Sequence, residues 1–148
     1  MLYTAEDVTF TGLDGVVSHR LGDGAVLTVF GDYVRADLKS AEDELPCISS
    51  CRLGVRYDWS DEPWSADVEC YRTFEQERVA SYETRTEGYN MLNATVAYRL
   101  DLEARRWVDL YVRGTNLTND LAFSHTSFVK DQSPLRGLNL VAGVRHTF

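Results

Sequence analysis

Four side chains that could bind a ligand lie close together near the end of this sequence. His125, Lys130, Asp131 and Arg136 bring an imidazole, two cations and a carboxylate into one short stretch. Imidazole is a common metal ligand, and charged side chains attract polar or ionic molecules. We therefore expect this stretch to contact a ligand, and His125 could help to bind a metal or a metal complex. The alternative is that His125 is an ordinary histidine on a loop surface.

Three cysteines are the second group with possible chemistry. Cys47 and Cys51 flank a three-residue segment, and Cys70 lies farther along the chain. A Cys-x3-Cys pair could form a local disulfide in an oxidising compartment. It would be a poor zinc site, because no histidine or second cysteine pair lies nearby in sequence. We expect Cys70 to be an inert residue that packs against a neighbour or faces lipid.

Composition narrows the class of protein. A chain of 148 residues suits one domain, and a hydrophobic content of 44% argues against disorder. The net charge of −8 argues against a nucleic-acid partner. No apolar run reaches the roughly 20 residues of a transmembrane helix, and the first residues do not resemble a signal peptide. Composition alone thus indicates a soluble cytoplasmic protein, but the strand pattern indicates something else.

Period-two alternation of apolar and polar residues recurs along the chain, whereas no apolar stripe of helical spacing lasts three turns. Clear examples are residues 51–59, 64–71, 91–100, 107–115 and 139–148, and residues 7–21 and 27–38 are less regular strands. The pattern predicts an all-β protein with seven strands.

The connections between these strands alternate strictly in length. Short ones are predicted at Gly22–Gly24, Ser60–Pro63 and Asp101–Arg106, and long ones at Lys39–Ser50, Thr73–Gly88 and Asn116–Gly137. Transmembrane β-barrels have such short periplasmic turns and long extracellular loops. The acidic run Glu42–Glu44 is expected to be a solvated face of one long loop. We therefore predict antiparallel up-and-down strands that form part of a transmembrane β-barrel, about seven strands and unclosed.

In such a barrel the apolar strand face meets lipid and the mixed face meets the lumen. The predicted lumenal residues would be costly in a dry core; they are Arg52, Arg56, Asp58, Asp67, Glu69, Arg99, Asp109 and Arg113. Four aromatic residues fall beside the short turns, where interfacial aromatics collect; they are Trp59, Trp64, Tyr98 and Phe148. The alternative is that these are core aromatics of a β-sandwich.

The end of the sequence combines four features: Asn116-Leu117-Thr118-Asn119 after a strand, a long last loop, Gly137-Leu138-Asn139 at the entry to the final strand, and the terminal Phe148. In this combination it resembles the carboxy-terminal end of TonB-dependent outer-membrane receptors. Leu138 replaces the arginine usual in that family. Weaker similarity extends upstream through "FTGLDGVVSHRL" and "ELPCISSCRLGVRYDW", so that it covers nearly the whole chain.

The resemblance implies a location and a set of partners. It implies a bacterial outer membrane with the carboxy-terminus in the periplasm, and Phe148 as the signal read by the barrel assembly machinery. Family barrels have about twenty-two strands and a plugged lumen. Residues 1–148 are thus expected to be the carboxy-terminal segment of a receptor barrel, without its plug domain and its TonB-engaging segment. The parent protein would take up a scarce nutrient through the TonB complex.

The substrate stays open among ferric siderophores, haem, cobalamin, zinc and sugars. We expect no cofactor and no enzymatic activity, since the sequence has no nucleophile-elbow, phosphate-loop or dinucleotide-binding motif. Two alternatives are a soluble lipocalin-like barrel, which needs an apolar interior, and a small outer-membrane barrel that is an enzyme or a structural protein.

Overall fold

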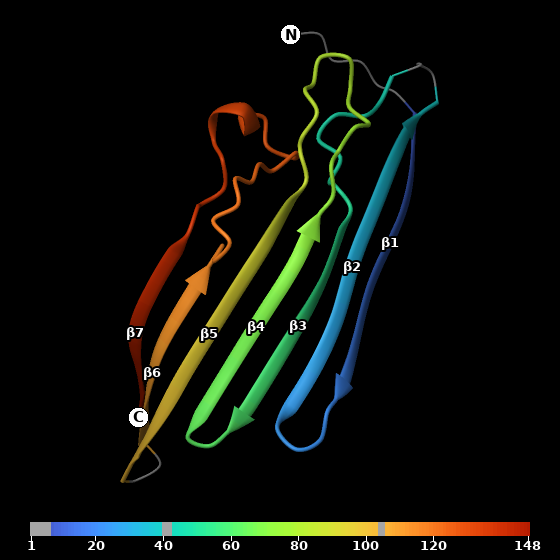
Figure 1. Ribbon diagram of the computed structural model, residues 1–148. Coiled ribbons are helices and arrows are strands. Elements are labelled where there is room, and N and C mark those ends of the chain that lie inside the picture. The colour runs from blue at the N-terminus through green and yellow to red at the C-terminus, as the bar shows by residue number, and fades with distance from the viewer. Residues whose placement is uncertain (1–6, 40–42, 104–105) are drawn as a thin grey trace.

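The computed structural model describes residues 7–39, 43–103 and 106–148. Seven strands make up most of the chain (Figure 1). They are β1 (Val8–Arg20), β2 (Ala25–Leu38), β3 (Arg52–Asp61), β4 (Trp64–Thr73), β5 (Tyr89–Leu102), β6 (Arg106–Thr115) and β7 (Asn139–Thr147), with one short 3-10 helix, η1 (Lys130–Gln132). The all-β prediction is confirmed. No helix within the described residues has the length and apolar character needed to cross a membrane.

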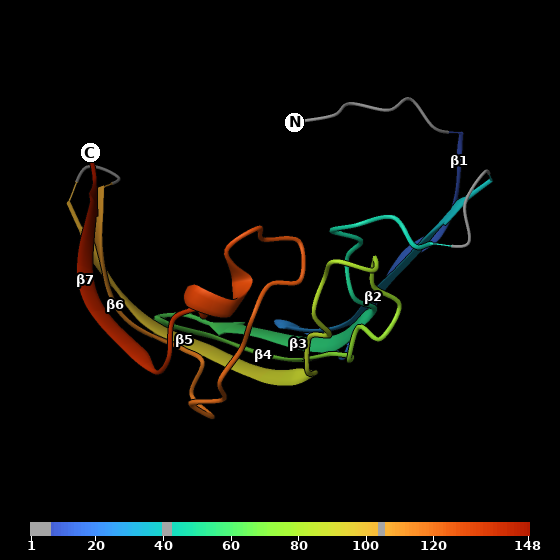
Figure 2. The same ribbon diagram turned by 90° about the horizontal axis from the view of Figure 1, so that it is seen from above.

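All seven strands belong to one sheet in the order β1 to β7, and each pairs antiparallel with its neighbours in sequence. The sheet is unclosed, since β1 and β7 are its two edges. Seen from above, it curves into an arc with a concave and a convex side (Figure 2). This is the predicted unclosed wall of up-and-down strands.

Short and long connections lie at opposite ends of the sheet (Figure 1). We call these the short-turn end and the long-loop end. The β1–β2 turn uses Gly22 and Gly24, both in the left-handed region with φ values of 83° and 86°, where glycine has no steric penalty. A Cβ on Gly24 would also lie 2.2 Å from the carbonyl oxygen of Ser60, so this turn packs against the next one.

The convex face carries a continuous apolar surface because strand register aligns the apolar residues of neighbouring strands. Tyr57 pairs with Val68, and Val68 in turn with Ala94. Toward the β7 edge, on the same face, Leu110 pairs with Val144, which is 68% exposed. Among the described residues no large side chain is fully buried. The sheet therefore presents its apolar side chains outward instead of enclosing them in a core.

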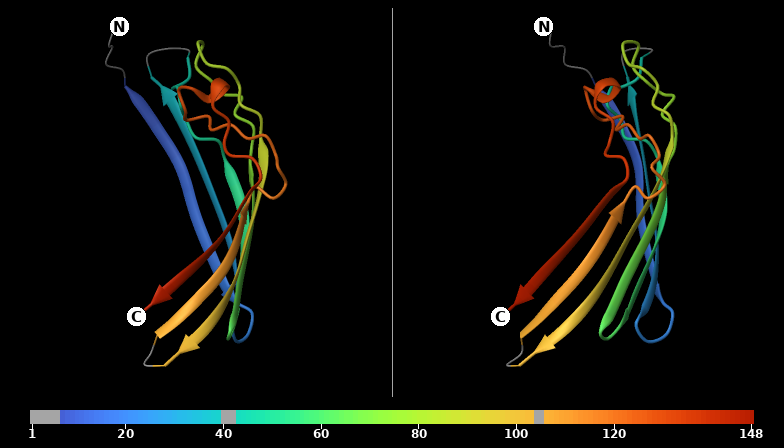
Figure 3. Two further views of the ribbon diagram at one scale, coloured as in Figure 1. Left: turned by 90° about the vertical axis from the view of Figure 1, so that its left-hand side faces the viewer. Right: turned by 60° about the vertical axis from the view of Figure 1, so that its left-hand side comes forward.

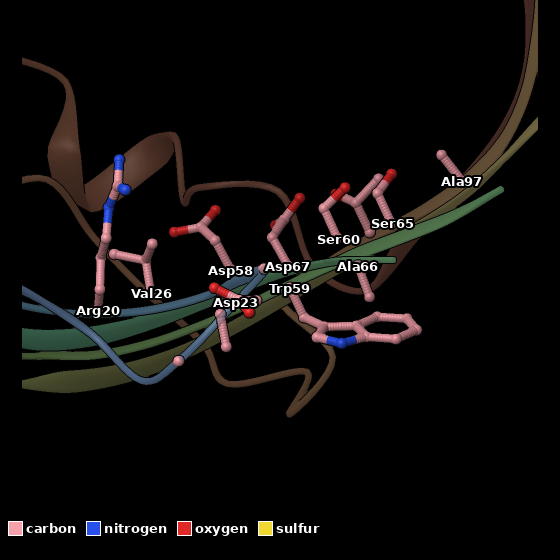
Figure 4. Close-up of a pocket in the computed structure, with 14 residues that line it drawn as sticks. Arg20, Asp23, Val26, Asp58, Trp59, Ser60, Ser65, Ala66, Asp67 and Ala97 are labelled. Carbon is pink, nitrogen blue, oxygen red and sulfur yellow. The ribbon is translucent and has the colours of Figure 1, made fainter. Parts of the chain in front are cut away.

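The concave face carries the charged residues predicted for the lumen, partly as ion pairs. Arg52 lies 2.7 Å from Asp32, Arg56 lies 2.7 Å from Asp58, and Arg99 lies 3.1 Å from Asp109. Figure 4 shows the two faces at β3 and β4: Asp58 and Asp67 point to one side of the sheet, and Trp59 and Ala66 to the other. The predicted division into an apolar and a mixed face is confirmed.

A glycine on the concave face is enclosed by two aromatic rings. A Cβ on Gly54 would lie 2.4 Å from the ring of Phe30 and 2.7 Å from Cβ of Tyr71. The two rings lie 6.5 Å apart, and the Arg52 guanidinium lies over both, at 5.6 and 5.7 Å from their centroids. Only a residue without a side chain leaves room for this stack, which joins β2, β3 and β4.

Aromatic residues mark the short-turn end, as predicted. Trp64 at the start of β4 is 48% exposed and contacts Tyr98 of β5, with ring centroids 4.8 Å apart. Phe148 follows β7 at the same end, and its ring lies 5.2 Å from that of His146. These residues are at the surface, so they are not the core of a β-sandwich. A lipocalin-like barrel is not supported either, because its apolar face would have to lie inside.

Candidate ligand-binding loops

The three long connections gather at one end of the sheet (Figure 3). We call them the β2–β3 loop (residues 39–51), the β4–β5 loop (74–88) and the β6–β7 loop (116–138). From above, η1 of the β6–β7 loop lies on the concave side of the arc (Figure 2). Hydrogen bonds between side chain and backbone link the three loops, so that they form one polar assembly above the strand ends.

Ionic contacts join the β2–β3 loop to the β4–β5 loop. Arg78 lies 2.6 Å from Glu44 and 3.0 Å from Asp37 at the end of β2. Asp43 accepts hydrogen bonds from the backbone N–H and the hydroxyl of Ser81, at 2.9 and 3.0 Å. The backbone N–H of Glu44 and the Ser81 hydroxyl lower the pKa of Asp43. Asp43 and Glu44 are therefore paired and half-buried, a correction to the expected solvated run; Glu42 lies outside the described residues.

The base of the β6–β7 loop depends on two asparagines of the motif Asn116-Leu117-Thr118-Asn119. Asn116 and Asn119 have φ values of 50° and 52°, a left-handed conformation that asparagine tolerates better than most residues. Asn116 is 2% exposed, and its amide group donates to the carbonyl oxygens of Asp120 and Arg136. Asn119 accepts from the backbone N–H of Leu138 at 3.0 Å. The motif thus closes the two ends of the loop.

His125 and Lys130 form the buried centre of the same loop. They are 4% and 6% exposed. The Lys130 ammonium donates to the Thr84 carbonyl oxygen, to Thr86 Oγ1 at 3.0 Å and to His125 Nδ1 at 3.1 Å. Thr86 Oγ1 also lies 2.8 Å from His125 Nδ1. Both residues act as internal partners of the loops in this structure, and their contact with a ligand stays a prediction.

These contacts indicate which tautomer the ring adopts. An ammonium group can only donate, so Nδ1 of His125 must accept, and the proton of the neutral imidazole lies on Nε2. The closest acidic group is Glu83, whose Oε2 lies 3.8 Å from Nε2. Within the described residues Nε2 has no hydrogen-bond partner. Burial, and then the charge of Lys130, lower the pKa of His125, while Glu83 opposes them.

Glu83 connects this centre to the β2–β3 loop. Its Oε1 accepts from the backbone N–H of Cys47 at 3.0 Å and lies 3.7 Å from the Cys47 thiol. Burial and the Glu83 carboxylate raise the pKa of Cys47. Cys47, Cys51 and Cys70 are all free thiols. The disulfide suggested for Cys47 and Cys51 is thus not formed here; Cys47 is directed to Glu83 instead, from a backbone with φ of 58°.

The other two predicted ligand contacts are exposed. Asp131 accepts from the Thr84 hydroxyl at 3.1 Å, and Arg136 also lies at the surface. Phe128 of the same loop is 93% exposed. In the β6–β7 loop Lys130 is buried and Phe128 is exposed, which reverses the usual burial preferences of lysine and phenylalanine. The outer surface of the β6–β7 loop therefore offers a carboxylate, a guanidinium and an apolar ring.

The described parts of the loops do not contain a formed metal site. No group of three or more His, Cys, Asp or Glu side chains within the described ranges has the arrangement needed to hold a metal ion. His125 Nε2 carries a proton in the tautomer assigned above, which also disfavours coordination at this atom. The hydroxyl of Ser124, which precedes His125 in sequence, bonds to Thr126 at 3.0 Å.

A separate hollow of 620 Å³ lies at the short-turn end, lined partly by concave-face residues (Figure 4). Asp58 and Asp67 are direct cross-strand partners there, with Arg20, Ser65 and Ala97 around them. Like charges opposite each other destabilise a strand pair, and the Arg56–Asp58 ion pair offsets part of this cost. The hollow is a polar face of the wall, remote in the fold from the loops.

No family model matches the sequence. Among solved structures, the chain is similar to the copper transporter OprC, with a TM-score of 0.83 and 18% sequence identity. The match covers 95% of this chain and 24% of OprC, so this chain spans about a quarter of that protein's length. At such identity the likeness concerns the fold. The fold is that of part of a β-barrel. Membership of the TonB-dependent family is a proposal that rests on the terminal motifs.

Proposed function

We propose that this chain forms part of the wall of an outer-membrane transport barrel for a metal or a metal-containing nutrient. The observation that carries the proposal is the distribution of side chains over the two faces of the sheet. Apolar residues such as Val17 and Val144 are 72% and 68% exposed on the convex face, whereas ion pairs line the concave face. Lipid outside and water inside would stabilise this arrangement.

The open edges β1 and β7 agree with this function. Unpaired backbone groups in lipid are costly, so in a membrane both edges must pair with further strands. The structural likeness to a quarter of a copper transporter supports a larger barrel and makes copper ions the first substrate to test. The TonB complex, the barrel assembly machinery and a small nutrient ligand are the partners that the sequence motifs suggest.

In this proposal the long-loop end faces outward and its exposed surface contacts the substrate. The exposed groups of the β6–β7 loop are Asp131, Arg136 and Phe128. The buried His125 and Lys130 hold that surface in place. A connection of this length between two strands is also uncommon unless it has a function.

Uptake of radiolabelled copper by cells that produce the whole transporter tests the proposal. Deleting Ala122–Gln132 should abolish uptake and leave the amount of inserted protein unchanged. The control is Phe148→Ala, which should lower the amount of assembled protein but not the uptake per assembled molecule. Uptake that survives the deletion would exclude the β6–β7 loop from substrate binding. Undiminished assembly of the Phe148 variant would exclude an assembly role for the terminal residue.

A further inference from the structure

Two basic side chains of the β6–β7 loop, Lys130 and His125, contact each other where the long loops meet. Both are buried, and both pack against the β4–β5 loop. Lys130 Nζ and His125 Nδ1 are 3.1 Å apart. Their remaining partners, Thr84 and Thr86, belong to the β4–β5 loop. This contact is favourable only while the imidazole is neutral, because only then does Nδ1 have a lone pair for the ammonium group.

We propose that His125 is the trigger of a proton-operated latch that holds the β6–β7 loop against the β4–β5 loop. With neutral His125, the three donors of Lys130 meet three acceptors. When His125 gains a proton, Nδ1 becomes a donor, and two positive charges face each other at 3.1 Å in a buried site. Lys130 then leaves the site, and the β6–β7 loop separates from its neighbour.

The other charged groups around the ring do not remove this conflict. Glu83 faces Nε2 from the β4–β5 loop at 3.8 Å and would favour the imidazolium. Its oxygens, however, already accept from the backbone N–H groups of Cys47 and Ala80. The Cys47 thiol of the β2–β3 loop lies against Glu83, and Asp131 is turned to the Thr84 hydroxyl. The contact between His125 and Lys130 therefore decides the response.

The direction of the pH effect follows from linkage. Burial and the charge of Lys130 lower the pKa of His125 below its ordinary value of 6.5, so the latched state binds fewer protons than the open one. The latch is closed above pH 6.5 and weakens as pH falls from there toward the lowered pKa. Acid opens the loop, and neutral pH closes it.

Hydrogen exchange of the full chain in detergent micelles tests the latch without any transported ligand, so its result is independent of the transport proposal. Amide protection factors for residues 124–135 are compared at about pH 7.5 and about pH 5, after correction for intrinsic exchange. Wild type should lose protection about tenfold at the lower pH. His125→Asn keeps an acceptor near the position of Nδ1 but cannot titrate, so its protection should stay constant.

The matched control is His146→Asn, which removes an exposed histidine on β7 and should behave like wild type. Equal protection of the wild-type loop at both pH values would overturn the latch, as would a wild-type response in His125→Asn. His125→Asn could instead loosen the loop at every pH. In that case nitrogen NMR of the wild-type imidazole, which shows which ring nitrogen carries the proton, tests the latch. A proton on Nε2 at neutral pH supports the latch, and a proton on Nδ1 overturns it.

Discussion

Trp64 and Tyr98 meet edge to face across β4 and β5, with ring centroids 4.8 Å apart, at the short-turn end of the convex face. Their backbones are direct register partners, so the contact is a cross-strand pair. Such aromatic pairs contribute about 0.5–1.5 kcal/mol beyond the area they bury. A double-mutant cycle with Trp64→Ala and Tyr98→Ala, measured by urea unfolding in micelles, should give a coupling free energy in that range. Additive single effects would show that the two rings are independent.

Replacing Gly54 by alanine should destabilise the sheet by about 1–3 kcal/mol, because the new methyl group overlaps the rings packed there. Its Cβ would lie 2.4 Å from Phe30 and 2.7 Å from Tyr71. The matched control is Gly15→Ala on the edge strand β1, where a Cβ would have no neighbour within 4 Å. Urea unfolding of both variants compares the two sites. A Gly54 variant as stable as the Gly15 variant would contradict the packing described.

The Cys47 thiol should react slowly with a maleimide at mildly alkaline pH, since burial and Glu83 raise its pKa and the thiolate is the reactive form. Glu83→Gln keeps a hydrogen-bond acceptor for the Cys47 backbone but removes the charge. In a protein whose other two cysteines are serine, this change should increase the rate. The control is Glu83→Gln in a protein that keeps Cys51 and has serine at the other two cysteines, where the maleimide rate should not change. An unchanged Cys47 rate would show that the carboxylate does not govern the thiol.

The strands could be predicted from sequence because each lies between surroundings of different polarity. Tyr57 and Val68 face one side and Arg56 and Asp67 the other, which leaves period-two alternation in the sequence. The alternation of short and long connections then predicted that the short turns lie at one end of the sheet and the long loops at the other. The prediction needed no knowledge of long-range contacts, since every strand pairs with its neighbour in sequence.

The loop centre could not be predicted in this way. Lysine and histidine usually remain at least partly exposed, and nothing near Lys130 in sequence indicates that residues of another loop would supply its acceptors. Thr86 and Glu83 carry no motif, yet Thr86 contacts Nδ1 of His125 and Glu83 faces its Nε2. The Cys47–Cys51 spacing permitted a disulfide, but the left-handed backbone at Cys47 and its bond to Glu83 lie outside what spacing reveals.

The most direct test of the wall is the environment of two neighbouring residues on β4. Cys70 is an exposed native thiol on the apolar face, and Glu69 lies on the charged face. In the whole transporter that contains this chain, a spin label is attached to Cys70 after removal of the other cysteines, or to Glu69→Cys with Cys70→Ala as well. Each protein is inserted into phospholipid vesicles. The label at residue 70 should collide mainly with lipid-soluble oxygen, and the label at residue 69 mainly with a water-soluble nickel complex. Equal access of the nickel complex to both labels would contradict a membrane wall.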